Sequence, residues 1–556
     1  MGQVARGRWR RFTRVTTRLI PARVRAVGPE RVAGAVGTRV VRVGGMTLVV
    51  AGSTDHLRDV THGPLADTPT TRVRIVVAYW RHFPNWSHGI RPTPHLVRHR
   101  VALPHLRRGT AVVTLRYTKP VPLATAVDAA LSALAPTHPW PPRVSDHNAS
   151  TDIADPTALA EVGAPDSPPP STEPDPADGR SANGSAHVRG AGARDAGRAV
   201  VFDATRVNPV GRRADAYLPD AAQERIGRPT FDAATLARLR RARTVAVSAG
   251  PGPGPGLDAA DVAALAATGA VVEGVGALPA AAREGLATEL LDLLAAPAPA
   301  DGDGDALAAE ARSVRHRRAA LRHHAAGLTG RALPTVSAIL ATRRPELIGP
   351  ALGMLAGQTY PMLEIVICLH GVAAPRGLAA AMGGRPHQIV ELPAGASFGE
   401  VLGVASARAG GELLTKVDDD DTYGPEHVWD LVLARHYSGA TLVGKGSELV
   451  FLESRGTVVR RASGVPEAYG ELVSGGTMLI ARGDLDAVGG WRPVPRSVDL
   501  GLVERLRRAG ATIYRTHPLG YVYHRRAAGH TWDPGEAYFV DAARTTWPSI
   551  PPDALA

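Results

Sequence analysis

The sequence predicts an α/β protein whose C-terminal part is a mostly parallel sheet with helices on both faces, preceded by a small α/β unit and a mixed N-terminal region. The first observation is an alternation, from residue 334 onward, of apolar runs of strand length with helical patterns. The second is that the runs at 335–340 and 363–369 are almost continuously apolar, as in strands covered on both faces by helices. With 556 residues, of which 44% are hydrophobic, the chain has room for about three or four domains.

Residues 1–43 are predicted to form a basic arm. They hold eleven arginines and one acid, Glu30, so most of the net charge of +12 lies in this short stretch. Such an arm can hold anionic lipid headgroups or another polyanion by electrostatic attraction, although a solvated tail explains the composition equally well. Nucleic acid is a less suitable partner, because Trp9 and Phe12 are the only aromatic residues of the arm that could stack on bases.

The rest of the composition indicates in which cellular compartment the protein is expected. No uncharged apolar run is long enough to span a membrane, and the first 43 residues lack the apolar core of a secretory signal. Cys368 is the only cysteine, which excludes an internal disulfide and a zinc site built from thiolates. We therefore expect a cytoplasmic protein, with the arm allowing peripheral contact with the inner face of the membrane.

Two segments follow the arm. Residues 44–143 alternate apolar stretches with one helical pattern and predict an α+β region. Residues 144–198 are predicted to be a disordered linker. Their acidic part, from 145 to 179, has eight Asp or Glu residues and no Lys or Arg, so it cannot bury enough apolar surface to become ordered.

A β-α rhythm then returns. Residues 199–299 predict a small α/β unit, with strands at 199–202, 244–248 and 270–275 and helices at 258–267 and 279–295. Residues 300–330 predict a second linker that ends in a basic helix at 311–326. Neither segment carries a motif whose chemistry we can assign.

The domain predicted over residues 331–556 supplies a ligand-binding edge. After its first strand, Pro345 opens a helix, and the apolar residues of this helix share one face: Ile348, Leu352 and Leu355. Ligands of parallel α/β sheets bind beyond the carboxyl ends of the strands. That rule places four residues at the edge: Thr342, Arg343, Arg344 and His370.

The strongest local feature is a run of four aspartates, Asp418 to Asp421, directly after an apolar run. In an extended stretch Asp418 and Asp420 point to the same side, and two such carboxylates suit Mg²⁺ or Mn²⁺, which takes one or two carboxylates plus substrate phosphates. The alternative is a solvated acidic turn in which Asp421 or Thr422 caps the helix that begins near Pro425.

With these motifs in place, the C-terminal domain resembles the family 2 glycosyltransferases of GT-A fold. Five motifs carry the resemblance between residues 334 and 532, and they come in the family's order. They are VSAILATRRPEL at 336–347, QTYP at 358–361, GE at 411–412 before the aspartates, GGTMLIAR at 475–482 with GGW at 489–491, and VDLGLVERL at 498–506.

The resemblance implies roles for the residues at the nucleotide and the metal. Thr342 and Arg343 would lie against the nucleotide base. Asp418 would contact the nucleotide and, together with Asp420, bind Mn²⁺ or Mg²⁺. A late histidine near the metal would be His530.

The resemblance also implies the reaction. His524 is the second choice for the late histidine near the metal. Asp499 would be the catalytic base that takes the proton from an acceptor hydroxyl. Direct attack then inverts the anomeric centre. The implied activity is a metal-dependent transfer of a sugar, of the hexosyltransferase kind, from a nucleotide-diphosphate sugar to a glycan or lipid-linked acceptor of the bacterial cell wall. The metal neutralises the charge that develops on the leaving diphosphate.

Two departures from the family leave alternatives open. Leu369 and His370 stand where the family commonly has an acid that reads the base or ribose, and Val498 replaces the glutamate before the base. A degenerate domain that serves as a scaffold or polyanion binder is one alternative. A nucleotidyltransferase is another, although residues 341–344 lack the glycine-rich loop that it needs. Lys445 could reach a phosphate, but a solvated lysine is more typical.

Overall fold

The computed structural model describes residues 30–134 and 200–556, apart from gaps at 33–37, 44, 62–64, 82–89, 91–92, 104–107, 228, 249–256, 297–305, 327, 329–332 and 527–534. The predicted linker at 144–198, most of the predicted basic arm and His530 therefore lie outside the described residues.

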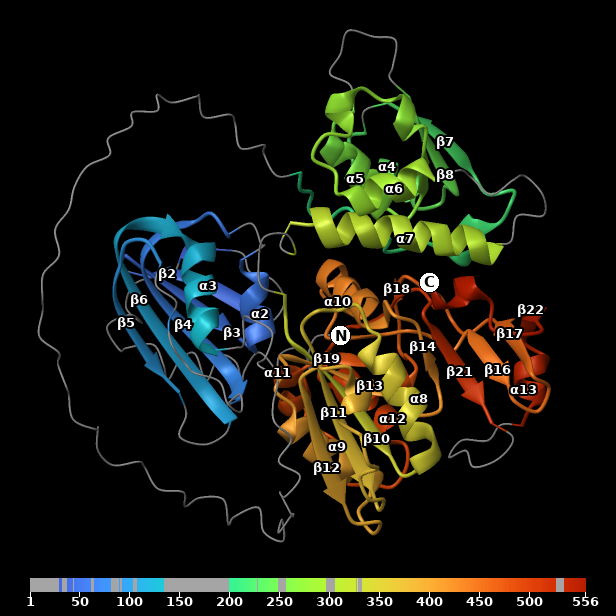
Figure 1. The fold of residues 1–556 in the computed structure, drawn as a ribbon. Helices are drawn as coiled ribbons and strands as arrows, with labels where there is room; N and C mark the ends of the chain where they lie inside the picture. The colour runs from blue at the N-terminus through green and yellow to red at the C-terminus, as the bar shows by residue number, and fades with distance from the viewer. Residues whose placement is uncertain are drawn as a thin grey trace, which may run out of the picture. The chain divides into compact units, whose positions relative to one another are not determined.

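The C-terminal domain is built on an eight-stranded sheet in which β10, β11, β12 and β13 are parallel neighbours (Figure 1). Six of the seven residues of β10 and seven of the eight residues of β11 are buried, as expected for strands covered on both faces. The predicted strands and the α/β class are confirmed. Across the sheet the strands are β12 (His387–Leu392), β11 (Leu363–His370), β10 (Val336–Thr342), β13 (Leu413–Val417), β19 (Leu479–Ala481), β15 (Leu442–Gly444), β20 (Ile513–Arg515) and β18 (Ala468–Tyr469).

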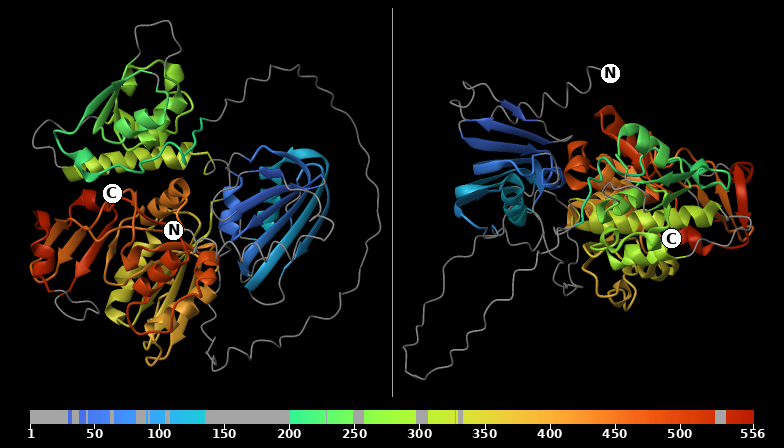
Figure 2. Two further views of the ribbon diagram at one scale, coloured as in Figure 1. Left: turned by 180° about the vertical axis from the view of Figure 1, so that it is seen from behind. Right: turned by 90° about the horizontal axis from the view of Figure 1, so that it is seen from above.

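Helices cover both faces of this sheet (Figures 1 and 2). On one face α8 buries its predicted residues Ile348, Leu352 and Leu355 in the same core as α10. On the other face α9 and α12 share a core with Ile339 of β10. The helices are α8 (Pro345–Ala356), α9 (Phe398–Arg408), α10 (His427–Ser438), α11 (Arg482–Ala487) and α12 (Val498–Arg508).

A second, five-stranded sheet completes the domain, and no sequence pattern predicts it. It arises because β16 pairs in parallel with β21, a strand that comes much later in the chain. Its strands and the helix beside them are β14 (Thr422–Tyr423), β21 (Tyr521–Arg525), β16 (Leu449–Leu452), β17 (Thr457–Arg461), β22 (Ala543–Trp547) and α13 (Ala537–Val540).

The small α/β unit has a three-stranded parallel sheet of β7 (Gln223–Ile226), β8 (Thr244–Val247) and β9 (Val271–Glu273), with helices α4 (Ala233–Leu239), α5 (Ala259–Ala267) and α6 (Thr288–Ala295). Two of its predicted elements are wrong. The described part of the strand predicted at 199–202, residues 200–202, forms only an isolated bridge from Phe202 to Ala325. The helix predicted from 279 begins at Thr288, because Gly285 takes a left-handed conformation, φ 86°, that interrupts it.

The predicted basic helix is α7 (Ala306–His324), and two of its five arginines, Arg317 and Arg318, are buried. Arg317 Nη2 lies 2.6 Å from Glu467, and Arg318 Nε lies 2.8 Å from Asp430 of α10. Lys445, expected to be solvated, is fully buried, and its Nζ lies 2.8 Å from Asp430. That expectation is wrong because Asp430 needs buried counter-ions.

The N-terminal region has a six-stranded sheet of β1 (Glu30–Val32), β2 (Thr38–Val43), β3 (Met46–Ala51), β4 (Pro69–Arg81), β6 (Arg108–Pro122) and β5 (Leu96–Ala102), in this spatial order. Two helices, α2 (Thr54–Asp59) and α3 (Leu123–Leu134), pack on one face. Two of these strands, β1 and β2, fall inside the predicted basic arm. Within the described residues, no helix combines the length and apolarity needed to cross a bilayer.

Candidate active site

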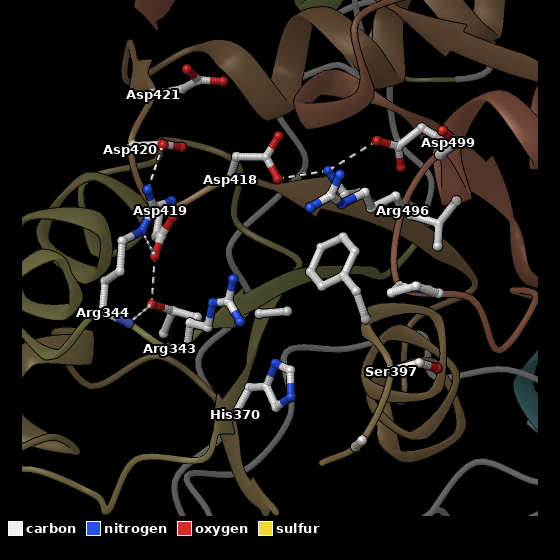
Figure 3. Close-up of a pocket in the computed structure, with 18 of the residues that line it drawn as sticks. Arg343, Arg344, His370, Ser397, Asp418, Asp419, Asp420, Asp421, Arg496 and Asp499 are labelled. Atoms are coloured by element: carbon white, nitrogen blue, oxygen red, sulfur yellow. Dashed lines mark hydrogen bonds and ion pairs between the residues drawn. The ribbon is translucent and has the colours of Figure 1, made fainter. Parts of the chain in front are cut away.

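A cavity of about 530 Å³ opens at the carboxyl ends of β10, β11 and β13 (Figure 3). This is the edge at which parallel α/β sheets bind ligands. All four aspartates of the run contribute to its wall, as does Asp499 at the start of α12. The lining residues are Ala341, Thr342, Arg343, Arg344, His370, Ala394, Ala396, Ser397, Phe398, Lys416, Asp418, Asp419, Asp420, Asp421, Pro495, Arg496, Ser497, Val498, Asp499 and Tyr523.

Arg344 forms ion pairs with two of the four aspartates. Its Nε lies 3.0 Å from Asp419 Oδ2, and its Nη1 lies 2.7 Å from Asp420 Oδ2. Burial opposes the guanidinium charge, but Asp419 and Asp420 outweigh it and raise the pKa of Arg344. Asp419 also accepts a 2.5 Å hydrogen bond from Thr342 Oγ1, so the predicted nucleotide residue Thr342 is tied to the acidic run.

Lys416 joins the predicted metal ligand to the predicted base. Its buried Nζ lies 2.6 Å from Asp418 Oδ1 and 3.4 Å from Asp499 Oδ2. The two carboxylates themselves reach the cavity, with side chains 33% and 30% exposed. Burial opposes the ammonium charge, but Asp418 and Asp499 raise the pKa of Lys416 above its ordinary value.

Asp499 has the environment of a proton acceptor. Burial raises the pKa of Asp499 above its ordinary value, and Lys416 opposes that shift. Its Oδ1 is buried and, among the described residues, has no hydrogen-bond partner. A carboxylate that lines the cavity and has a raised pKa is suited to take a proton from a bound hydroxyl.

Two glycines allow the chain to pass against both carboxylates. A Cβ at Gly475 would lie 2.8 Å from Asp499 Cγ, and a Cβ at Gly476 would lie 2.7 Å from Asp418 Oδ2. Any side chain here would displace the carboxylates. The GGT motif thus lies at the site, although its sequence alone does not show which groups it touches.

Asp421 is structural and does not cap a helix. It accepts hydrogen bonds from Tyr521 Oη at 2.8 Å and from the backbone N–H of His524 at 2.9 Å. Burial, with Asp418 nearby, raises the pKa of Asp421. The expectation that Asp421 or Thr422 caps the next helix is wrong, because α10 begins at His427 after Glu426, with no side-chain cap.

The part of the cavity remote from Asp421 is lined by cationic and hydrogen-bonding groups. Figure 3 shows Arg343 beside His370, and Arg496 between them and Asp499. His370 Nε2 lies 3.2 Å from the Ala394 carbonyl oxygen. Sequence reasoning missed Arg496 and Lys416. Lys416 had a signal, since a lysine within an apolar strand two residues before Asp418 points to the same side.

Neither histidine predicted near the metal lines the cavity in the part of the chain that the structure describes. His530 lies outside the described residues. His524 Nε2 lies 2.7 Å from Thr422 Oγ1, and His524 does not line the cavity. No group of three or more His, Cys, Asp or Glu residues within the described ranges is arranged to hold a metal ion. Asp418 and Asp420 nevertheless fit Mg²⁺ or Mn²⁺, which commonly use one or two carboxylates and complete their shell with phosphates and water.

Comparison with known proteins gives a fold-level similarity only. No family model matches the sequence, and no curated protein matches it. Among solved structures, the chain is similar to the mannosyltransferase PcManGT from Pyrobaculum calidifontis in complex with GDP-Man and Mn²⁺, with 15% identity, a TM-score of 0.28, and coverage of 36% of this chain and 59% of that chain. It is also similar to S. aureus TarS 1–349, with 17% identity, a TM-score of 0.27, and coverage of 34% of this chain and 60% of that chain. For TarS 1–349 in complex with UDP-GlcNAc the identity is 17%, the TM-score is 0.28, and the coverage is 37% of this chain and 64% of that chain.

The chain thus spans less than two thirds of the length of each of these structures. At such identities and TM-scores, the similarity carries no argument about what the site binds. The chemistry of the cavity is therefore inferred from the residues that line it.

Proposed function

We propose that the cavity is the active site of a glycosyltransferase that moves a sugar from a nucleotide-diphosphate sugar to an acceptor hydroxyl. One observation carries the proposal. Three carboxylates, Asp418, Asp420 and Asp499, reach one cavity at the carboxyl ends of parallel strands, and Arg343 and Arg496 line the same cavity. Carboxylates for a cation and a proton, with guanidinium groups for phosphates, are what this reaction needs.

Asp418 and Asp420 are the residues that would hold Mn²⁺ or Mg²⁺. When bound, the ion neutralises the negative charge that develops on the leaving diphosphate. Arg344 and Lys416 hold these carboxylates in place, and each leaves one carboxylate oxygen outside its ion pair. His530 remains the predicted third protein ligand.

Asp499 would act as the base in a single displacement. The acceptor oxygen forms a bond to the anomeric carbon while the bond from that carbon to the diphosphate oxygen breaks. The proton of the acceptor hydroxyl passes to Asp499, and the diphosphate leaves with the electron pair. Attack from the side opposite the leaving group inverts the anomeric centre. Burial, which raises the pKa of Asp499, favours this proton transfer.

Thr342 and Arg343 would position the nucleotide. The Thr342 hydroxyl already donates to Asp419, so Thr342 would contribute shape and backbone groups, while Arg343 reaches into the cavity with an exposed guanidinium. His370 stands beside it and supplies an imidazole in place of the family's acid. A glycan or lipid-linked acceptor on the inner face of a membrane is the acceptor class that we propose.

The proposal is tested by calorimetric titration of the full chain with UDP, GDP, CDP and ADP, with and without Mn²⁺. We expect Mn²⁺-dependent binding of one diphosphate, weakened at least tenfold in Asp420→Asn. Asp220→Asn, which removes an exposed carboxylate of the small α/β unit, is the matched control and should bind as the native chain does. Binding that is unaffected by Mn²⁺ and by Asp420→Asn would overturn the metal assignment. No binding of any diphosphate would favour the scaffold alternative.

A further inference from the structure

The two faces of the N-terminal sheet carry different side chains. The helices α2 and α3 pack against alternate residues of β4 and β6, such as Ile75 and Val113. The intervening residues point to the other face. There, Leu48, Val50 and Val76 form a small apolar cluster, and the remaining positions of three strands are rich in arginine.

Five arginines form a compact patch on that face, which we call the arginine face: Arg72, Arg74, Arg98, Arg100 and Arg116. The strand register places Arg98 directly opposite Arg116, which in turn lies directly opposite Arg72. Two residues further along the strands, and so on the same face, Arg100 and Arg74 lie on either side of Thr114. Residues directly opposite one another share a face, so all five side chains lie together.

The described strands β2 to β6 supply the arginine face with no acidic side chain. The strands β2 to β6 contain ten Lys or Arg residues and no Asp or Glu. Four of the five side chains are exposed; Arg74 is half-buried, and its Nε has no hydrogen-bond partner among the described residues. Like charges directly opposite one another destabilise a sheet, so the row Arg98–Arg116–Arg72 costs stability unless anions from outside neutralise it.

The chemistry of the patch selects among anions. Guanidinium groups bind phosphate oxygens in a two-pronged manner. The patch has no aromatic side chain on which the bases of single-stranded nucleic acid could stack. A second copy of the same face is excluded by charge. Lipid headgroups diffuse laterally, so they can place a phosphate beside each arginine whatever the spacing.

We propose that the arginine face docks on the anionic headgroups of a membrane. The eight arginines of residues 1–29, which precede this sheet and include no acid, add charge of the same sign. Each arginine near an anionic surface strengthens binding about fivefold, and the attraction weakens as salt rises. This docking does not depend on the activity proposed for the C-terminal cavity.

The test is sedimentation of the full chain with vesicles of phosphatidylglycerol or of phosphatidylcholine. The face variant carries Arg72→Gln, Arg98→Gln and Arg116→Gln. The control variant carries Arg225→Gln, Arg241→Gln and Arg283→Gln, which remove three exposed arginines of the small α/β unit. We expect the native chain to bind phosphatidylglycerol vesicles only, and the face variant to bind about 100-fold more weakly. The control variant should bind much as the native chain does.

Two further measurements separate loss of the face from loss of the fold. The face variant should unfold at the native temperature or above, because like charges have been removed. A second variant with lysine at the same three positions keeps the charge but loses the two-pronged contacts, so it should bind more tightly than the face variant and more weakly than the native chain. Equal binding by the face and control variants would overturn the proposal. So would a face variant that loses binding to a single-stranded oligonucleotide while its vesicle binding stays native.

Discussion

At the scale of single residues, Lys416 explains how two carboxylates can share one side of the cavity. Without a cation, Asp418 and Asp499 would repel each other across a short distance. The buried ammonium lies within 2.6 Å and 3.4 Å of them, so it holds both in place before any metal or substrate binds. Lys416 is a positioning residue, because it reaches the reaction through these two carboxylates.

Lys416→Met should therefore affect both activity and stability. We expect at least a tenfold loss of turnover and a loss of about 1–3 kcal/mol in the free energy of unfolding. The loss of stability should be smaller than for a fully buried ion pair, because both carboxylates are about one third exposed. Lys416→Arg should restore part of the activity. Lys119→Met, on an exposed position of β6, is the control and should leave both quantities near native. Native turnover in Lys416→Met would contradict the positioning role.

The glycines beside the carboxylates give a prediction of a different kind. Gly476→Ala places a Cβ 2.7 Å from Asp418 Oδ2, so the carboxylate must move away from its metal-binding position. We expect metal-dependent diphosphate binding to weaken at least tenfold, with a modest change in unfolding temperature. Gly470→Ala is the matched control, because nothing lies within 4 Å of the added Cβ. If both variants bind diphosphate equally well, Asp418 does not hold the metal.

At the scale of elements, α7 packs against the second sheet through a buried acidic pair. Glu310 of α7 lies 2.7 Å from Arg460 of β17, and Glu448, just before β16, shares that arginine at 3.9 Å. Arg460 is thus shared by two buried carboxylates, and Arg515 and Arg544 also lower the pKa of Glu448. Burial, reinforced by Glu310, raises the pKa of Glu448 to about 7. We therefore expect the packing of α7 to depend on pH.

The direction of that sensitivity follows from linkage. The folded state holds the Glu448 proton more tightly than the unfolded chain does, so stability falls as pH rises from about 4.3 to about 7. Glu448→Gln should remove this dependence and raise the free energy of unfolding at pH 8 by up to about 3 kcal/mol, with little effect at pH 4. Thermal unfolding at both pH values checks it, with the exposed Glu284→Gln as control. A Glu448→Gln variant that is no more stable at pH 8 than the native chain would contradict the shift.

At the scale of the whole molecule, the sequence predicts what is encoded locally. The strands β10 and β11 and the helix α8 were predictable because apolar periodicity and Pro345 are local signals. The place of Asp418 at the cavity was predictable from the rule that ligands bind at strand ends, because it follows β13. Asp499 lies at the start of α12, and only the family resemblance pointed to it. The ion pair of Arg344 with Asp419 and the β16–β21 pairing join distant segments, and no local pattern reports them.

The direct measurement of the proposed reaction is the release of nucleoside diphosphate from a panel of nucleotide sugars. It should be made on the native chain and on Asp499→Asn, with Mn²⁺ present. We predict that Asp499→Asn releases diphosphate at least 100-fold more slowly than the native chain. It should still bind the diphosphate with near-native affinity, because Asp418 and Asp420 are intact. If the Asp499→Asn variant turned over the donor at the native rate, that result would contradict the assignment of the base and, with it, the proposed mechanism.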